Sequence, residues 1–528
     1  MPVEYRIHPA IGVARVGDSP EEFFIGPEAP GIRPTMTKPD GPALASGHRG
    51  TYKDSKSRVK RQGARFRIYE FTSDHAGAVT SVREITAAHA RIEWEVHLVN
   101  RKAAAERAPE SEAIPRRKPK RRNEGAPEKD LIIDAGPHSI SGVSQRMKRL
   151  HGRFMNVDVP IGDLLTDAAG RLIVLGGFGK SQSVPAGAPL DSFANNDGWC
   201  DDTSDGPVRA KVTLNDSAQA VQADSAWVLV APPDFAPSLE NAVTLYDVVY
   251  DQTAKVADPS LAVTETSRVS FTKDIYPLLR RVSMLHWVSE VAASPRGHAQ
   301  NGINDFLSKV TVLSSNGADA ASERIRIAGA LRNPKTGIGK MPKLPEKTNK
   351  NVRGPFVPET QYTRMQRWAQ GTFDADWTGA EPAPVPLDQL PPAEQPHALD
   401  RAALEACVGG PFFPGIEVSG MMLDATTYDA KRPFRINVQL EPGTLTARMA
   451  IPWQADFHDC GKEGSADWWP GQRPTKVFGS GRTGSGLWMP DEWDRVDMVN
   501  QWMHLGFIVE ETTDGHTRYV EDERDFKV

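Results

Sequence analysis

The chain has 528 residues, of which 39% are hydrophobic and 25% are charged, and its net charge at pH 7 is −5. It is long enough to bury a large core in roughly two or three domains, and its composition is that of an ordinary globular protein. The charge balance gives no reason to expect a nucleic-acid partner, and no apolar stretch approaches the roughly 18 residues of a membrane span. The first residues lack the charged leader and apolar centre of a secretory signal. We therefore expect a cytoplasmic protein, with non-classical export as the alternative.

Residues 1–265 have the pattern of a strand-rich domain. Apolar and polar side chains alternate strictly in residues 65–71 and 91–99, which is typical of half-buried strands. The glycine-rich residues 176–179 follow an apolar run but match neither nucleotide-binding glycine motif, so we expect a β-turn there. Further strands are expected at residues 11–17, 153–159, 171–175, 208–214 and 225–230.

Two charged segments of this domain are expected to face solvent. Residues 101–130 are rich in charge and proline and nearly free of large apolar side chains, which predicts a mobile surface loop. The basic centre of that loop, residues 116–122, is either solvated or a docking patch. The acidic segment 197–207 lacks the ligand spacing of an EF-hand, so a solvated loop is expected rather than a calcium site. Its carboxylates are Asp197, Asp201, Asp202 and Asp205.

Residues 266–376 are expected to form a mainly helical region, because residues 271–290 and 361–370 carry apolar side chains at helical spacing. A proline-rich run then leads into residues 377–528. There we expect helices at 398–406 and 496–505 and strands at 434–439 and 445–451. The fold class predicted from these patterns is α+β, with strand-rich N-terminal and C-terminal parts and a mainly helical insert between them.

The cysteines Cys200, Cys407 and Cys460 are odd in number, widely spaced and without a CxxC motif. This pattern argues against a disulfide framework and against a structural zinc site, and we expect no metal. The sequence assigns no role to Cys200 or Cys407. Cys460 differs from them because other reactive side chains surround it.

The segment around Cys460 also carries Asp456 and His458, and the pair Trp468-Trp469 follows. In an extended segment, Asp456, His458 and Cys460 would project from one face. Three such side chains could bind a transition metal, or His458 could activate the thiol as a nucleophile. A buried, inert thiol beside polar surface groups is the remaining alternative.

The motif PWQADFHDC at residues 452–460, together with WWPGQRP at 468–474 and CVGGPFFPGIE at 407–417, resembles the L-lysine 6-oxidase and glycine oxidase family. Members of this family are quinoproteins that carry cysteine tryptophylquinone, a cofactor made from the protein's own side chains. The similarity extends through most of the chain. It includes residues 5–17, 197–207, 271–277 and 361–371.

The resemblance implies a thioether between Cys460 and either Trp469 or Trp468, with two oxygens added to that indole. Trp469 is favoured because Pro470 restrains its backbone. Asp456 matches the acidic residue of the family that takes part in cofactor formation and abstracts the substrate proton. His458 would either relay protons or have a structural role.

The resemblance also implies a reaction and its partners. The quinone would capture a primary amine or amino acid, either free or carried on a peptide, and dioxygen would reoxidise it to give hydrogen peroxide. A separate flavoprotein would assist maturation, and the protein would form a homo-oligomer. Two alternatives from other classes stay open: a relative without the quinone that acts as a binding scaffold, and a metal-dependent enzyme built on Asp456, His458 and Cys460. The substrate itself is not indicated by the sequence.

Overall fold

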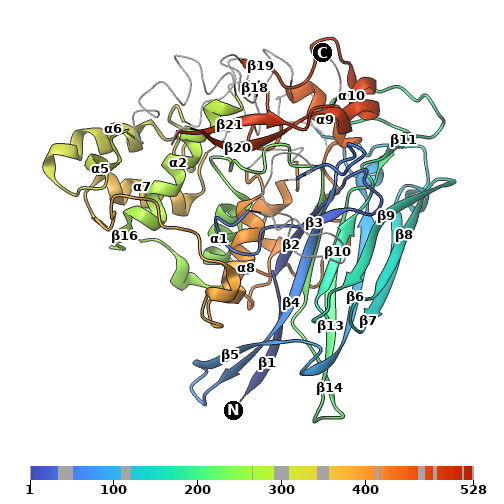
Figure 1. Ribbon diagram of the computed structural model, residues 1–528, viewed down its shortest axis with the longest axis horizontal. Coiled ribbons are helices and arrows are strands. Elements are labelled where there is room, and N and C mark those ends of the chain that lie inside the picture. The colour runs from blue at the N-terminus through green and yellow to red at the C-terminus, as the bar shows by residue number, and fades with distance from the viewer. Residues whose placement is uncertain are drawn as a thin grey trace.

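The computed structural model, shown in Figure 1, mixes strands and helices and confirms the predicted α+β class. It describes residues 2–33, 51–108, 120–264, 266–289, 308–341, 356–410, 416–418, 420–461, 470–479, 485–513 and 516–525.

One large sheet organises the N-terminal part of the chain. Its strands are β1 (Val3–His8), β2 (Ile11–Arg15), β3 (Phe23–Ile25), β4 (Arg61–Ser73), β5 (Val79–Ile85), β6 (Ala90–Asn100), β7 (Ile133–Ser141), β8 (Arg146–Phe154), β9 (Val157–Thr166), β10 (Leu172–Gly176), β13 (Ser204–Leu214), β14 (Ala220–Gln222) and β15 (Ala226–Ala231). The order is β7-β6-β13-β15-β2-β4-β10-β9-β8, with β1, β3 and β5 on β4 and β14 on β13. The sheet curls until its two ends approach each other, since a side chain at Gly152 of β8 would meet the backbone of Asp134 in β7. The strands predicted at residues 11–17, 65–71, 91–99, 171–175, 208–214 and 225–230 are confirmed. The single strand predicted at 153–159 is wrong, because Met155 and Asn156 form the tight turn that joins β8 to β9.

The central strands β2 and β15 are buried on both faces, and each face packs into a different core. Because side chains alternate along a strand, Trp227 and Leu229 of β15 enter one core, and Val228 and Val230 enter the other. The first pair meets helices, whereas the second pair meets the remaining strands of the curled sheet. The sheet therefore separates the two hydrophobic cores.

The helices lie mainly on one side of the sheet (Figure 1). They are α1 (Leu245–Val256), α2 (Tyr276–Met284), α5 (Val310–Leu313), α6 (Ala321–Ala330), α7 (Glu359–Ala369), α8 (Gln395–Glu405), α9 (Trp453–Gly461) and α10 (Arg495–Gln501). Short two-stranded sheets are formed by β11 (Ser181–Ser183) with β12 (Trp199–Asp201), β16 (Val269–Ser270) with β17 (Phe373–Asp374), β18 (Lys476–Phe478) with β19 (Ser485–Leu487), and β20 (Phe507–Thr513) with β21 (His516–Asp522). The predicted helices correspond to α2, α7, α8 and α10. Among the described helices, none has the length and apolar character that crossing a membrane requires. The division into regions 1–265, 266–376 and 377–528 stays a prediction.

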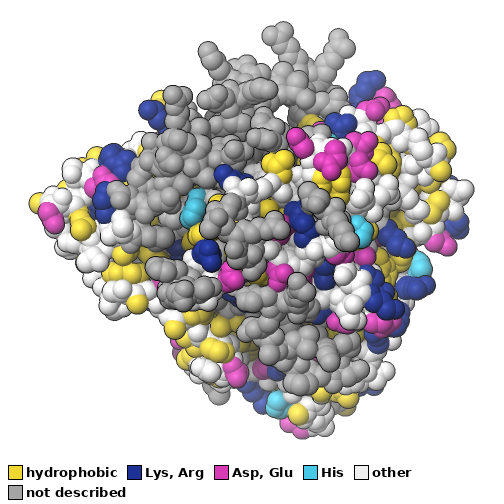
Figure 2. Space-filling model, turned by 45° about the horizontal axis from the view of Figure 1, so that its top comes forward, with side chains coloured by type: hydrophobic (Ala, Val, Ile, Leu, Met, Phe, Trp, Pro, Cys, Tyr) yellow, Lys and Arg dark blue, Asp and Glu magenta, His cyan; other side chains and the backbone are white. Residues whose placement is uncertain are grey.

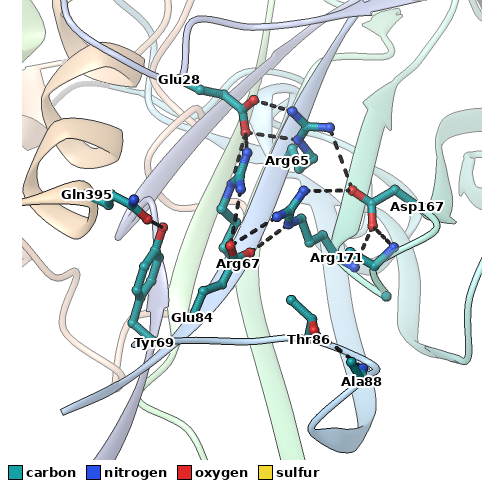
Figure 3. Close-up of polar contacts among 12 residues, drawn as sticks. Glu28, Arg65, Arg67, Tyr69, Glu84, Thr86, Ala88, Asp167, Arg171 and Gln395 are labelled. Carbon is teal, nitrogen blue, oxygen red and sulfur yellow. Dashed lines mark hydrogen bonds and ion pairs between the residues drawn. The ribbon is translucent and has the colours of Figure 1, made fainter. Parts of the chain in front are cut away.

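A network of charged side chains lies across β4 and its neighbours (Figure 3). Arg67 is central to it, because its guanidinium donates to Glu28 at 2.9 Å and to Glu84 at 3.4 Å. Glu84 also accepts from Arg171 Nε at 2.6 Å. Since these side chains are largely withdrawn from solvent and shared among several partners, the network is worth more than isolated surface pairs. Its members are Glu28, Arg65, Arg67, Glu84, Asp167 and Arg171.

Acidic and basic side chains are interspersed on the face of the molecule shown in Figure 2. Ion pairs between exposed side chains also occur in the structure, such as Arg209 with Glu95 at 3.0 Å. Exposed pairs of this kind each contribute little to stability, but they leave the surface without a large field of one sign.

The strands predicted at 434–439 and 445–451 are wrong, since both segments form turns. Apolar side chains such as Ile436 and Leu445 enter the core individually and produce the alternation that suggested strands. The backbone has other partners than a strand ladder: Asn437 N donates to Thr427 O at 2.9 Å. Thr446 N donates to a carboxylate at 2.8 Å. Apart from the isolated β-bridges at Ile436 and Ile451, the alternation here reflects burial without strand pairing.

Both charged segments predicted to face solvent are partly buried instead. Lys102 and Arg122, from the segment predicted to be a mobile loop, are both 0% exposed, and residues 109–119 lie outside the described part of the chain. In the acidic segment Asp201, Asp202 and Asp205 are buried. The predictions failed because the buried charges of each segment have partners in the other segment or in the backbone. Composition alone does not reveal such pairing.

Asp205 joins the sheet to the C-terminal part of the chain. It is 0% exposed and accepts from Trp227 Nε1 at 2.9 Å, from Thr446 N at 2.8 Å and from Thr446 Oγ1 at 2.6 Å. Asp205→Ala would leave these donors buried without an acceptor, at about 1–3 kcal/mol for each. We expect the free energy of unfolding, measured by denaturant titration, to fall by about 3 kcal/mol or more. Asp197→Ala is the matched control from the same segment, because Asp197 is half exposed; an equal loss in both variants would contradict the assignment.

Candidate active site

The helix α9 carries three of the predicted site residues, and the residues around it fix its position. Asp201 Oδ2 accepts from Trp453 N at 3.1 Å at the start of the helix, where a negative charge is favourable. Gln454 in the first turn accepts from Ser181 Oγ at 2.7 Å and donates to Gly179 O at 3.1 Å. Gly179 has a positive φ of 71°, and the backbone bends there in place of the β-turn predicted at residues 176–179. The glycine-rich segment therefore supports the first turn of α9.

Asp456 and Cys460 face each other because they are one helical turn apart. Cys460 Sγ donates to Asp456 Oδ1 at 3.3 Å. Asp456 is 6% exposed, and burial raises the pKa of its carboxyl, with the positive charge of Arg473 opposing that shift. Burial also raises the pKa of the Cys460 thiol well above its ordinary value, and the nearby Asp456 charge raises it further. The pair combines a carboxylate poised to take up a proton with a thiol that is kept protonated.

Residues 470–475 bring Arg473 to the other oxygen of this carboxylate. Phe235 N donates to Gln472 O at 2.8 Å and so fixes the backbone next to the arginine. The distance from Arg473 Nε to Asp456 Oδ2 is 4.0 Å, and the arginine is 0% exposed. None of its three guanidinium nitrogens has a hydrogen-bond partner among the described residues. Asp456 therefore lies between a thiol and a buried cation.

A second buried cation lies beneath the start of α9. Lys102 Nζ pairs with Asp201 Oδ2 and donates to Thr203 Oγ1 at 3.2 Å. Asn100 Nδ2 donates to Asp201 Oδ1 at 3.0 Å. Burial lowers the pKa of Lys102, although the Asp201 charge opposes this, and the Lys102 charge in turn lowers the pKa of Asp456. The pair thus supports α9, and the Lys102 charge favours the ionised form of Asp456.

His458 lies on a different side of α9 from Asp456 and Cys460. Its Nε2 contacts Trp493 O at 2.9 Å, and its Nδ1 contacts Asp459 Oδ1 at 2.7 Å. The segment is helical, so the extended arrangement that would put His458, Asp456 and Cys460 on one face is not formed. No cluster of three potential metal ligands occurs in the described ranges. The geometry that the metal and the thiol–imidazole alternatives need is therefore missing.

The structure bears differently on the two candidate tryptophans and on the two other cysteines. Trp468 and Trp469 lie outside the described residues, so their relation to Cys460 stays a prediction. Cys200 and Cys407 are buried, in β12 and beside Arg15 respectively, and burial raises the pKa of each thiol. Neither is among the residues that contact Asp456.

Family models match both halves of the chain. The model described as L-lysine epsilon oxidase N-terminal matches residues 8–230, and the model described as L-lysine epsilon oxidase C-terminal domain matches residues 338–479. Together they span more than half of the sequence and include α9. The chain belongs to the L-lysine ε-oxidase family.

Relatives in this family confirm the placement. The chain is 26% identical to the L-lysine 6-oxidase of Marinomonas mediterranea, over 86% of this chain and 70% of that protein. The fold is also similar to a solved structure of the ε-lysine oxidase of that organism, with a TM-score of 0.79, 24% identity and coverage of 99% and 95% of the two chains. A structure of the Schiff base intermediate of that enzyme with L-Lys gives a TM-score of 0.77 at 23% identity, with coverage of 98% and 95%. The resemblance inferred from the motifs is confirmed.

Membership of the L-lysine ε-oxidase family confirms the predicted enzyme class. The chain is an oxidoreductase that acts on an amine group with dioxygen as the acceptor, and the scaffold and metal alternatives are less well supported.

The sequence motifs did not predict the charged residues that surround Asp456 and the start of α9. Arg473 lies inside the motif at 468–474 but received no role, and Lys102 and Asp201 were assigned to solvated segments. Of these three residues, only Arg473 could have been suspected from the sequence, because it is a charged residue close to a cluster of aromatic residues.

Proposed function

We propose that this chain oxidatively deaminates a small primary amine or amino acid with cysteine tryptophylquinone formed from Cys460 and Trp469, or from Cys460 and Trp468. The amine, dioxygen and water would give a carbonyl compound, ammonia and hydrogen peroxide. The observation that carries the proposal is the pair of Asp456 and Cys460 on one face of α9, within the residues matched by the family's C-terminal model.

The residues around Cys460 fit such a cofactor. The thiol is partly buried and has a carboxylate at 3.3 Å that can accept its proton when a thioether forms. The guanidinium of Arg473 lies 4.0 Å from the other oxygen of that carboxylate, and its positive charge favours the ionised form that accepts the proton. A quinone there would supply an electrophilic carbonyl for the amine and a sink for two electrons.

Asp456 is the residue that would move the substrate proton. Its burial raises the carboxyl pKa towards the range in which a base both accepts and releases protons, and Arg473 and Lys102 limit that rise. Both of these cations come from segments anchored elsewhere in the fold, so the carboxylate is held in a fixed electrostatic environment. His458, bonded at both ring nitrogens, would anchor α9 to the loop before α10.

Three further features belong to the proposal. A flavoprotein partner would be needed for maturation, the protein would assemble as a homo-oligomer, and it would be cytoplasmic. The substrate would be either free or carried on a peptide.

Mass spectrometry of protein co-produced with its maturation partner tests the proposal. We expect a crosslink between the peptide containing Cys460 and the peptide containing Trp468 and Trp469, with a mass gain of about 28 Da from two oxygens gained and four hydrogens lost. Fragmentation would also identify the modified tryptophan. Quantitative alkylation of Cys460 in such a sample would show that the thioether does not form. Cys460→Ser is the control and should give neither crosslink nor mass gain.

A further inference from the structure

Arg473 is a buried cation whose hydrogen-bonding capacity is unused. It is 0% exposed, and Nε, Nη1 and Nη2 lack hydrogen-bond partners within the described part of the chain. Burying a guanidinium without an acceptor is costly, and leaving one orphaned is more costly than burying a satisfied pair. The arrangement indicates an acceptor that the described residues do not supply.

Asp456 does not fill this role. Its Oδ2 is 4.0 Å from Arg473 Nε, beyond hydrogen-bond distance, and its Oδ1 faces Cys460. The backbone beside the arginine is fixed, because the adjoining Gln472 O accepts from Phe235 N at 2.8 Å. The charge is therefore held next to the base at a distance that leaves its donors available.

We propose that Arg473 binds the α-carboxylate of the substrate, and that the substrate is an α-amino acid oxidised at its α-carbon. The inference rests on the proposed function and names the substrate class for the same site. The substrate carbon that loses its proton must lie next to Asp456. A carboxylate bonded directly to that carbon would then lie within reach of Arg473, whose Nε is 4.0 Å from Asp456 Oδ2. A carboxylate several bonds away, as in oxidation at the far end of a side chain, would lie elsewhere. A guanidinium can bind a carboxylate through two parallel hydrogen bonds.

The product would then be a 2-oxo acid. The α-carbon loses its hydrogen and two electrons, the nitrogen leaves as ammonia after hydrolysis, and dioxygen takes up the electrons as hydrogen peroxide. A simple amine lacks the anion for Arg473 and would leave the cation unsatisfied in the complex. Sites built to bind a polar group discriminate strongly against analogues that lack it.

The test compares Arg473→Met with wild-type protein, both co-produced with the maturation partner, on alanine and ethylamine and on leucine and isopentylamine. Each pair differs only in the α-carboxylate. We expect the ratio of kcat/KM for the amino acid to kcat/KM for the amine to fall by about 10²-fold or more in Arg473→Met. Arg473→Lys keeps the charge but not the paired donors, so its ratio should lie between the other two. Arg61→Met is the matched control: Arg61 is also 0% exposed, but it pairs with Asp163 in the sheet, and its ratio should stay that of wild type.

A measurement independent of turnover separates this proposal from the proposed function. Propionate, a carboxylate without an amine, should bind wild-type protein and Arg61→Met in calorimetric titration and should not bind Arg473→Met. If propionate binds in this pattern while no amine is oxidised, the anion site stands and the proposed function fails.

Three results would overturn the inference. The first is an unchanged substrate ratio in Arg473→Met, and the second is propionate binding that does not depend on Arg473. The third is loss of the mass gain of about 28 Da in Arg473→Met, since the guanidinium would then serve the oxygens of the quinone rather than the substrate.

Discussion

Replacement of Asp456 by asparagine is expected to lower kcat by roughly 10²–10⁴-fold, the contribution typical of a positioned general base. The exchange keeps the size of the side chain but removes its ability to accept the substrate proton. Because Asp456 Oδ1 also accepts from Cys460 Sγ, the same variant is expected to mature poorly. Peroxide release and the intact mass must therefore be measured on the same sample, and kcat is calculated per mature site.

The pH profile gives a second measure of the same role. Burial raises the pKa of Asp456 from an ordinary value of 3.8, and a base acts only when it is ionised. We therefore expect kcat/KM of the wild type to rise with pH through that raised pKa, so that the acidic limb lies above the range of an exposed aspartate. In Asp456→Asn this limb should be absent.

Asp459→Asn is the matched control on the same helix. Although burial opposes it, hydrogen bonds from His458 and Arg495 lower the pKa of Asp459, so this carboxylate belongs to a structural ion pair. The control should keep mature cofactor and the acidic limb of the profile. Wild-type rates of peroxide release in Asp456→Asn would contradict the assignment of the base.

The strands of the large sheet could be predicted from the sequence because their signal is local. In β6 and β13, apolar side chains alternate with charged ones, and the structure buries that apolar face. The same rule failed at residues 434–439 and 445–451. There the apolar side chains are buried without strand pairing, since the backbone donors find partners such as Asp205. Pairing between distant segments decides such cases, and alternation does not reveal it.

Only part of the candidate site could likewise be predicted from the sequence. Asp456 and Cys460 are four residues apart in a specific motif, so their proximity follows once the segment is helical. Lys102 was assigned to solvent because charged, proline-rich composition usually indicates exposure. Asp201 was assigned to solvent because its acidic segment lacks the ligand spacing of a calcium site. Their burial depends on a partner 99 residues away, and neither charge would be tolerated in the interior alone. Composition describes each segment separately and misses this mutual compensation.

That compensation leads to the second large expected effect. Lys102→Met removes the cation and leaves the Asp201 carboxylate buried without its ion-pair partner. Breaking a buried pair in this way typically costs about 3–5 kcal/mol. We expect a loss of that size in the free energy of unfolding, measured by urea titration monitored by tryptophan fluorescence and by circular dichroism. Peroxide release should fall as well, because Asp201 Oδ2 also accepts from Trp453 N at the start of α9.

A double-variant cycle distinguishes loss of the pair from loss of packing. Lys102→Met combined with Asp201→Asn removes both charges, and an amide oxygen can still accept from Trp453 N, so most of the lost stability should return. Lys120→Met provides the control, because Lys120 forms an exposed pair with Glu124 in the same stretch of sequence and should be nearly neutral. If the double variant is as unstable as Lys102→Met, the charge on Asp201 is not the cause of the loss. In that case the aliphatic part of Lys102 supports α9 by packing, and the positive potential at Asp456 must come mainly from Arg473.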